Sequence, residues 1–346
     1  VIEARNLTFA YEGEHTPVLE DVNFSIAEGS IAFISGLSGS GKSTLLNIIN
    51  GLIPEVIDGK LTGELLIGGK SRVTMTERSA LIGNVFQNPR SQFFTTNTTA
   101  ELVFAMENFG APKPEMERRL KALIKKYKLE YLLDRDIYEL SSGERQMLAL
   151  MSALIMNPRI VIFDEPSANL GIDSIFDLHE ILCELKREGK TVIVLEHRLF
   201  YLKDLFDRMI YVHKGKIEGV LSNAESVGLS DEQRKRMKLR SFNPQCCLPC
   251  GIRNTKYTPD GRCSDFEIRS LSFCYDRKNA STPMLSDISL KANRGDIIGI
   301  VGKNGMGKTT LAKLCAGLVK EHTGTITLDG TVLSAKKRLG TIYFVM

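Results

Sequence analysis

Short apolar runs alternate along this chain with longer segments in which apolar residues recur at helical spacing. The runs are partly β-branched and bounded by glycine or charged residues, as is typical of strands buried on both faces. They cover residues 31–34, 160–163, 192–195 and 297–301. The helical patterns cover residues 43–50, 114–133, 143–156 and 174–189. This order predicts an α/β fold in which helices connect the strands of a parallel sheet.

The chain also contains an internal repeat. Residues 5–11 align with residues 269–275, and the glycine-rich stretches that begin at Gly36 and Gly302 follow in the same register. A spacing of about 265 residues is far too long for a solenoid repeat, so we interpret the repeat as two copies of one domain.

The repeat and the loss of periodicity between its copies suggest domain boundaries. We expect a complete first domain at 1–220, a linker at 221–264, and the amino-terminal part of a second domain at 265–346. The expected linker holds a basic run at 234–240, which we interpret as a solvated helix, with contact to anionic lipid or a partner as the alternative.

Cysteines in the expected linker leave two readings open. One is a Zn²⁺ site, because thiolates at short spacing can share a tetrahedral metal; the other is free thiols, favoured because the second Cys-x-x-Cys is incomplete. The cysteines concerned are Cys246, Cys247, Cys250 and Cys263.

Composition narrows the class of protein without naming it. A hydrophobic content of 43% with 25% charged residues is globular, and a net charge of +4 is too small to indicate nucleic-acid binding. No apolar run approaches the roughly 18 residues of a membrane-spanning helix. No secretory signal is visible, and seven cysteines, none in the first half, do not form a disulfide framework. We therefore expect a chain without membrane spans in a reducing, cytoplasmic setting.

A glycine-rich stretch after the first buried strand predicts a phosphate site. Gly, four residues and Gly-Lys-Ser between a strand and a helix form a cradle of backbone N–H groups, to which the helix N-terminus adds its positive dipole. Lys42 is expected to reach the β and γ phosphates, and Ser43 to ligate Mg²⁺. The expected ATP contacts are Gly36, Ser38, Gly39, Ser40, Gly41, Lys42, Ser43 and Thr44.

The second copy repeats this cradle after the run at 297–301. Its expected ATP contacts are Gly302, Asn304, Gly305, Gly307, Lys308, Thr309 and Thr310, with Thr309 also at Mg²⁺.

Carboxylates end the second buried run. Asp164 suits a role at Mg²⁺, and Glu165 is placed to polarise an attacking water. His197 follows the next run, where a lone histidine is ordinarily structural. Its place in this order of motifs favours a functional role instead.

The stretch Leu-Ser-Ser-Gly-Glu-Arg-Gln at 140–146 resembles the signature loop of ATP-binding cassette (ABC) ATPases. The resemblance covers the first copy throughout and what is present of the second. It implies a P-loop NTPase fold with a RecA-like core on a parallel sheet, an antiparallel β subdomain and a helical subdomain, here duplicated.

The resemblance also implies roles for single residues. Tyr11 and Tyr275 would stack on adenine, Gln87 would sense the γ-phosphate and Mg²⁺, and His197 would contact the γ-phosphate.

The signature loop would act across a pair of cassettes. Its N–H groups would serve a γ-phosphate held by a second ABC domain of the same chain or by another ATPase chain. The residues concerned are Ser141, Ser142, Gly143 and Glu144. Ser142 and Glu144 depart from the usual Gly and Gln, so we expect a bulkier loop with an added negative charge. Gly171 stands where an Asp is usual, which puts cross-domain communication through that side chain in doubt.

The segment after Phe86 resembles the ATPases of energy-coupling-factor importers, at residues 87–94, at Glu101 and at residues 107–110. That resemblance implies an integral membrane coupling subunit and a substrate-binding membrane subunit as partners, a place on the cytoplasmic face of the cell membrane, and a micronutrient cargo such as a vitamin, a vitamin precursor or a metal ion. Phe93 and Phe94 would line the groove for the coupling subunit, or alternatively belong to the domain core.

Two other functions stay open on the sequence alone. A soluble ABC ATPase acting on ribosomes or DNA is one, although no long charged helical linker or coiled-coil insertion is present. A nucleotide-binding fragment without useful turnover is the other, since the second copy lacks a signature loop, an acidic strand end and a switch histidine. We expect ATP and Mg²⁺ as ligands and no nucleic-acid partner.

Overall fold

The computed structural model describes residues 2–168, 170–243, 265–275, 284–302, 306–321 and 323–345. The chain divides into two compact units, residues 1–248 and 249–346, and each is described by itself.

A six-stranded sheet forms the centre of the first unit. Its order is β5-β6-β7-β3-β8-β9; all neighbouring pairs are parallel except β8 with β9. Its strands are β3 (Ile31–Gly36), β5 (Ile82–Val85), β6 (Ile160–Asp164), β7 (Thr191–Leu195), β8 (Arg208–His213) and β9 (Lys216–Ser222). Because β3 and β7 are buried on both faces, they read as continuous apolar runs, and the predicted strands at 31–34, 160–163 and 192–195 are confirmed.

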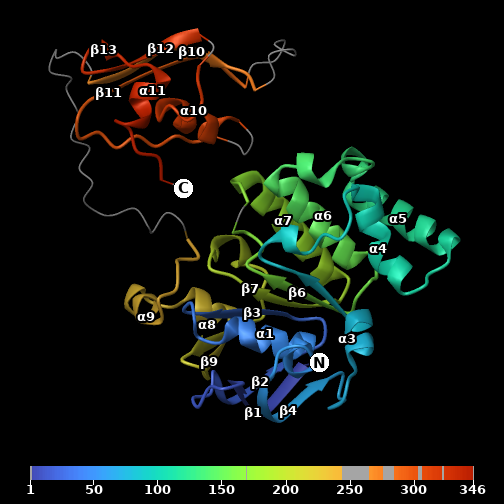
Figure 1. Ribbon diagram of the computed structural model, residues 1–346. Helices are drawn as coiled ribbons and strands as arrows, with labels where there is room; N and C mark the ends of the chain where they lie inside the picture. The colour runs from blue at the N-terminus through green and yellow to red at the C-terminus, as the bar shows by residue number, and fades with distance from the viewer. Residues whose placement is uncertain are drawn as a thin grey trace. The chain divides into compact units, whose positions relative to one another are not determined.

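Helices cover both faces of this sheet. In Figure 1, α6 (Ser142–Leu154) and α7 (Ile172–Arg187) lie on one face, and α1 (Lys42–Asn50) lies on the other. Alternate residues of β3 divide between two cores accordingly: Phe33 packs with the α6 and α7 side, and Ile34 with the α1 side. The predicted helices at these places are confirmed.

An antiparallel sheet lies over α1 in the first unit. Its order is β2-β1-β4, built from β1 (Ile2–Tyr11), β2 (Leu19–Ile26) and β4 (Gly59–Ile67). The short helices α2 (Leu52–Glu55) and α3 (Met75–Leu81) lead from α1 and β4 towards β5. The expectation of parallel and antiparallel parts is therefore confirmed.

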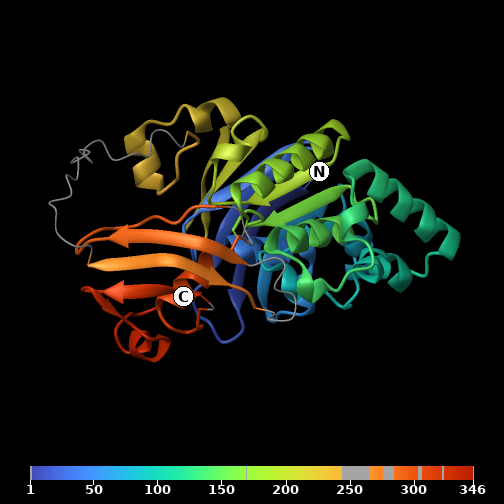
Figure 2. The ribbon, with the colours of Figure 1, turned by 90° about the horizontal axis from the view of Figure 1, so that it is seen from above.

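Two further helices form a helical region. These are α4 (Thr98–Asn108) and α5 (Lys113–Tyr127), and they lie at the side of the first unit opposite α8 and α9 (Figure 1 and Figure 2). The helix predicted over 114–133 is shorter than expected, because Lys128 adopts a left-handed conformation that ends α5 before a short 3-10 turn at Glu130–Leu132.

The start of the expected linker belongs to the first unit. Residues 221–243 hold the end of β9 and the helices α8 (Asn223–Val227) and α9 (Asp231–Met237). Phe242 is only 3% exposed and stacks on Phe206 with ring centroids 5.6 Å apart. The structure therefore differs from the boundary drawn at 220, because apolar residues after that point are spaced too irregularly to reveal their burial. Cys246, Cys247, Cys250 and Cys263 lie outside the described residues.

The second unit repeats the antiparallel part of the first. It consists of β10 (Phe266–Phe273), β11 (Leu285–Ala292), β12 (Thr323–Leu328), β13 (Thr331–Val332), α10 (Lys308–Cys315) and α11 (Ala335–Leu339). The sheet order is β11-β10-β12-β13. β10 has its register shifts where β1 has them, and Gly324 approaches the backbone of Arg269 as Gly63 approaches that of Arg5.

The strand predicted at 297–301 is wrong. The residues there form no strand, and Ile297 and Val301 are 99% and 92% exposed. In the first unit β3 pairs with both β7 and β8. Within the described residues of the second unit no parallel strand stands beside 297–301, so its backbone groups have no sheet partner.

A stability measurement tests the new boundary. Phe242→Ala should lower the free energy of unfolding of the first unit by about 3 kcal/mol, because it leaves a cavity beside Phe206. Phe176→Ala is the matched control, since that ring is exposed and its loss should cost no more than about 0.5 kcal/mol. Urea unfolding of both variants gives the comparison. Equal losses would mean that residues 221–243 do not stabilise the unit.

Candidate nucleotide-binding and hydrolysis site

The glycine-rich loop joins β3 to α1 and is shaped by its glycines. Gly39 and Gly41 have φ angles of 77° and 100°. A Cβ on Gly41 would lie 2.7 Å from Leu19 Cδ2 and 3.1 Å from the Val18 carbonyl oxygen, so no other residue fits there. Gly41 also caps α1, and the free N–H groups of that helix point into the loop.

The loop's lysine is held inside the cradle. Lys42 is buried and its Nζ donates to the carbonyl oxygens of Gly36 and Leu37, at 2.8 and 2.7 Å. Burial lowers the pKa of Lys42, and the carboxylates of Glu165 and Asp164 oppose that shift. The cradle thus brings one ammonium group and the helix N-terminus to a single place.

Polar groups of the loop fit a polyphosphate. Ser40 Oγ is buried and has no hydrogen-bond partner among the described residues, which suits an acceptor oxygen from a ligand. Ser43 is exposed at the start of α1. Ser38 lies in the same loop and is also exposed.

An aromatic residue stands beside the cradle. The Tyr11 hydroxyl lies 3.0 Å from Thr44 Oγ1, and the Tyr11 ring meets Phe9 edge to face. The second unit repeats this arrangement with Tyr275 and Thr310 at 3.2 Å. The structure therefore brings the expected adenine-stacking residues next to their loops.

Glu165 is the meeting point of the expected catalytic residues. Gln87 Nε2 donates to Glu165 Oε2 at 2.8 Å, and His197 Nε2 lies 3.1 Å from Glu165 Oε1. The three side chains come from the loops after β5, β6 and β7, whose carboxyl ends share one edge of the sheet. Glu165 has a φ of 46°, a left-handed conformation that is costly outside glycine and is typical of functional sites.

Asp164 precedes Glu165 at the end of β6. Burial raises the pKa of Asp164, the Glu165 charge raises it further, and Lys42 lowers it. The ionised form of a carboxylate that is buried beside a second negative charge is stabilised by added positive charge. Among the described residues no cluster of three or more His, Cys, Asp or Glu side chains is arranged around a metal position. A hydroxyl from Ser43, a carboxylate from Asp164 and an amide from Gln87 are nevertheless oxygen donors of the kind Mg²⁺ prefers.

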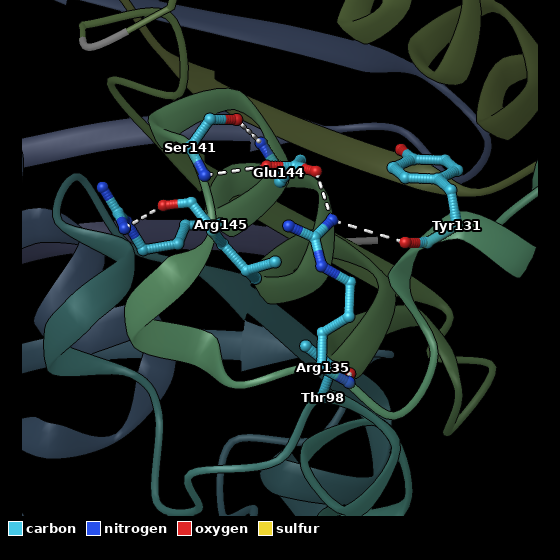
Figure 3. A network of polar contacts seen from close by, with 7 residues as sticks. Thr98, Tyr131, Arg135, Ser141, Glu144 and Arg145 are labelled. Atoms are coloured by element: carbon cyan, nitrogen blue, oxygen red, sulfur yellow. Dashed lines mark hydrogen bonds and ion pairs between the residues drawn. The ribbon is translucent and has the colours of Figure 1, made fainter. Parts of the chain in front are cut away.

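The signature loop begins α6, and Figure 3 shows its contacts. Ser141 caps the helix: its side chain accepts from Glu144 N–H, and Glu144 Oε2 accepts from Ser141 N–H at 2.7 Å. Gly143 lies against α7, where a Cβ would be 2.8 Å from Ser174 Oγ. Ser142 is the first residue of the helix.

The added negative charge of Glu144 is neutralised. Arg135 Nη1 lies 2.5 Å from Glu144 Oε1 (Figure 3). The Arg135 carbonyl oxygen accepts from Thr98 N–H, and Arg135 N–H donates to Thr98 Oγ1 at the start of α4. Burial raises the pKa of Glu144, but hydrogen bonds from Ser141 and Arg135 hold it below its ordinary value. No sequence pattern indicates Arg135, because the ion pair joins a loop to a helix nine residues later.

The described ends of the second glycine-rich loop make contacts similar to those of the first. Gly307 caps α10 with a φ of 83°, and Lys308 Nζ donates to the Gly302 carbonyl oxygen at 2.6 Å. Thr309 lies in the first turn of α10. Asn304 and Gly305 lie outside the described residues.

Phe93 and Phe94 differ in their surroundings. Phe93 is partly buried against the larger core, whereas Phe94 is 74% exposed and stacks on Phe104 with centroids 4.9 Å apart. The buried carboxylate of Glu101 accepts from the Phe94 and Thr95 N–H groups and so fixes this loop. The core alternative therefore holds only for Phe93.

The parallel sheet, the cradle and the acidic end of β6 define a P-loop nucleoside-triphosphate-binding protein. The family model described as ABC transporter matches residues 19–168 and 285–343.

Curated relatives and solved structures agree with this match. A putative ABC transporter ATP-binding protein of Treponema denticola is 38% identical over 352 residues, covering 100% of this chain and 71% of the relative. A putative HMP/thiamine import ATP-binding protein of Bacillus subtilis is 31% identical and covers 99% of this chain and 67% of the relative. CbiO1 of Clostridium perfringens, described as part of the ABC transporter complex cbiONQ, has a TM-score of 0.60 at 25% identity over 68% of this chain and 93% of its own.

A dimeric cassette bound to ADP and Pi, MJ0796, is also similar. Its TM-score is 0.55 at 29% identity over 64% of this chain and 99% of its own. The chain therefore belongs to the ABC transporter ATP-binding proteins, and it is an ATPase that hydrolyses ATP to drive transport. In the part of the chain that the structure describes, no helix is long and apolar enough to cross a bilayer.

The Arg135 and Glu144 pair predicts a pH-dependent stability. At pH 7, Arg135→Gln should lower the free energy of unfolding by about 0.5–1 kcal/mol, as is usual for partly exposed pairs. Because the folded pKa of Glu144 is depressed, its contribution is present above the unfolded pKa and is lost as the pH falls through the folded pKa.

The difference between wild type and Arg135→Gln should therefore shrink towards about pH 3, as measured by urea unfolding at both pH values. Glu144→Gln keeps the helix cap and removes the charge, so Arg135→Gln should have little effect in that background. A pH-independent difference would contradict an ionic origin.

Proposed function

We propose that this chain is the ATPase subunit of an importer of the energy-coupling-factor type that takes up a micronutrient. The observation that carries the proposal is the convergence of Gln87 and His197 on Glu165, at the sheet edge that also carries the Lys42 cradle. Such a site suits hydrolysis of a bound nucleoside triphosphate rather than binding alone.

Binding is assigned to the cradle. The loop N–H groups and the start of α1 hold the phosphates, Lys42 exchanges its carbonyl partners for the β and γ phosphate oxygens, and Tyr11 stacks on adenine. Ser43, Asp164 and Gln87 would hold Mg²⁺, which supplies charge neutralisation at the phosphates when bound. Thr309 would play the part of Ser43 in the second unit.

Hydrolysis is assigned to the residues around Glu165. Its carboxylate accepts a proton from the attacking water, His197 contacts the γ-phosphate, and Gln87 orients the water. The 3.1 Å contact between His197 and Glu165 holds both side chains at the phosphate side of β6 and β7. The signature residues Ser141, Ser142, Gly143 and Glu144 would donate N–H groups to a nucleotide held by a partner cassette.

The repeat supports a tandem arrangement. We infer that residues 265–346 derive from a second cassette, because the cradle, the tyrosine and the strand register recur there. The partner cassette would be supplied by this chain or by another copy.

The relatives support the type of importer and its partners. The similarity to a protein named for HMP/thiamine import and to a component of cbiONQ favours a vitamin, vitamin precursor or metal ion as cargo. The chain would work at the cytoplasmic face of the membrane with an integral coupling subunit and a substrate-binding subunit. Exposed Phe94 beside Phe104 provides an apolar contact for the coupling subunit.

Removal of the carboxylate tests the hydrolytic role. Glu165→Gln should lower the turnover number at least about 100-fold, because the amide cannot accept the proton, while ATP affinity stays near that of wild type. Phosphate release and binding of a fluorescent ATP analogue measure the two quantities. Lys42→Ala is the contrasting variant, in which binding itself should be lost. Turnover that persists in Glu165→Gln would overturn the assignment.

Co-expression with a coupling subunit tests the transport role. Assembly should stimulate ATP hydrolysis, and Phe94→Ala should remove the stimulation while leaving basal turnover intact, because the ring lies outside the hydrolytic site. Val56→Ala, also at an exposed apolar residue, is the control. Stimulation that survives Phe94→Ala would place the coupling contact elsewhere.

A further inference from the structure

Glu196 is a buried carboxylate between the switch histidine and the end of β7. It is only 3% exposed, and it directly precedes His197. Buried carboxylates are rare unless their oxygens are satisfied, and this one accepts hydrogen bonds on both oxygens.

The donors to Glu196 come from two different loops. Oε1 accepts from the N–H groups of His197 and Arg198, at 2.7 and 3.0 Å. Oε2 accepts from the N–H of Ser167 at 3.2 Å and from the Tyr201 hydroxyl at 2.8 Å. Oε1 therefore fixes the turn that carries His197, whereas Oε2 links the loop that follows Glu165 to Tyr201 in the segment after β7.

Neighbouring contacts join the same two loops. Glu165 N–H donates to the Leu195 carbonyl oxygen at 2.9 Å, and Arg198 Nη1 donates to the Leu170 carbonyl oxygen at 3.3 Å. These bonds flank the side-chain contact between His197 and Glu165. Within this group, Glu196 accepts backbone N–H groups from both loops, from His197 and Arg198 after β7 and from Ser167 after β6.

We propose that Glu196 is a positioning residue for ATP hydrolysis, which sets the His197 imidazole against the Glu165 carboxylate by tying the loop after β7 to the loop after β6. The proposal rests on the hydrolytic roles proposed above for Glu165 and His197. Glu196 bonds to the main chain of the loop after β6 at Ser167. The same loop carries Gly171, which has no side chain that could make such a contact.

Only a carboxylate meets the demands of this position. The three backbone N–H groups can only donate, so an amide at 196 must turn its own NH₂ towards at least one of them. The Tyr201 hydroxyl can reverse and accept from an amide, but Ser167 N–H cannot. Glu196→Gln is therefore expected to keep the bonds to His197 and Arg198 and to lose the one to Ser167.

The test is a double-mutant cycle on the full chain. Glu196→Gln should lower the turnover number about 10- to 100-fold, as small misplacements in active sites do, with the Michaelis constant for ATP within about twofold of wild type. If Glu196 acts through His197, adding Glu196→Gln to His197→Ala should cause no further loss.

Glu101→Gln is the matched control. Glu101 is also a buried carboxylate that accepts backbone N–H groups, from Phe94 and Thr95, but it touches neither Glu165 nor His197 in any bond of the structure. Its effect on turnover should be additive with His197→Ala.

Hydrogen exchange gives a readout that does not depend on turnover. In Glu196→Gln the amide of Ser167 should exchange faster, while the amides of His197 and Arg198 keep their protection. The thermal unfolding midpoint should fall no further than it does in Glu101→Gln. Uniformly faster exchange, or equal losses of affinity and turnover, would show a merely structural carboxylate and overturn the proposal.

The outcomes separate the two levels of the argument. Wild-type turnover in Glu165→Gln or His197→Ala would defeat the proposed function. Loss of turnover in both, with wild-type turnover in Glu196→Gln, would defeat the inference about Glu196 alone.

Discussion

The structure depends on the position of β3 between β7 and β8. Both edges of this strand are paired in parallel, so its end is fixed by hydrogen bonds to strands made much later in the chain. The glycine-rich loop leaves from that end, and the loops after β6 and β7 leave from the same edge. One sheet edge therefore gathers the glycine-rich loop, the carboxylates and His197, although these groups lie far apart in the sequence.

The second unit shows what happens where this pairing is lacking. Its antiparallel sheet and α10 form with the registers of the first unit, and Lys308 reaches its loop carbonyl as Lys42 does. The segment at 297–301, equally apolar, forms no strand within the described residues. The helix α10, its glycine cap at Gly307 and the bond from Lys308 to Gly302 thus form when the segment before them has no strand neighbours among the described residues, because they are determined locally.

Sequence patterns predicted those features that are local or periodic. Strands buried on both faces gave continuous apolar runs, and Gly41 and Lys42 belong to a motif whose spacing carries its own mechanism. Contacts between distant loops had no such signal. The fold alone brings Arg135 to Glu144 and Glu196 to Ser167. The residues around Arg135 and Glu196 in the sequence do not indicate these partners. The strand at 297–301 failed for the related reason that an apolar run records a tendency to be buried and not the presence of neighbours.

The pairing of β3 also bears on the order in which the chain acquires its parts. β1 and β2 are joined by a short loop, and β4 follows within the first 67 residues, so the antiparallel sheet is built from contacts that are close in sequence. The central strand β3 pairs with β7 and β8, so its pairing cannot be completed until residues 191–213 have been synthesised. The strand end that carries the glycine-rich loop and the sheet edge that carries Glu165 and His197 are therefore completed in the same late step of folding, so a chain interrupted before residue 213 would lack both.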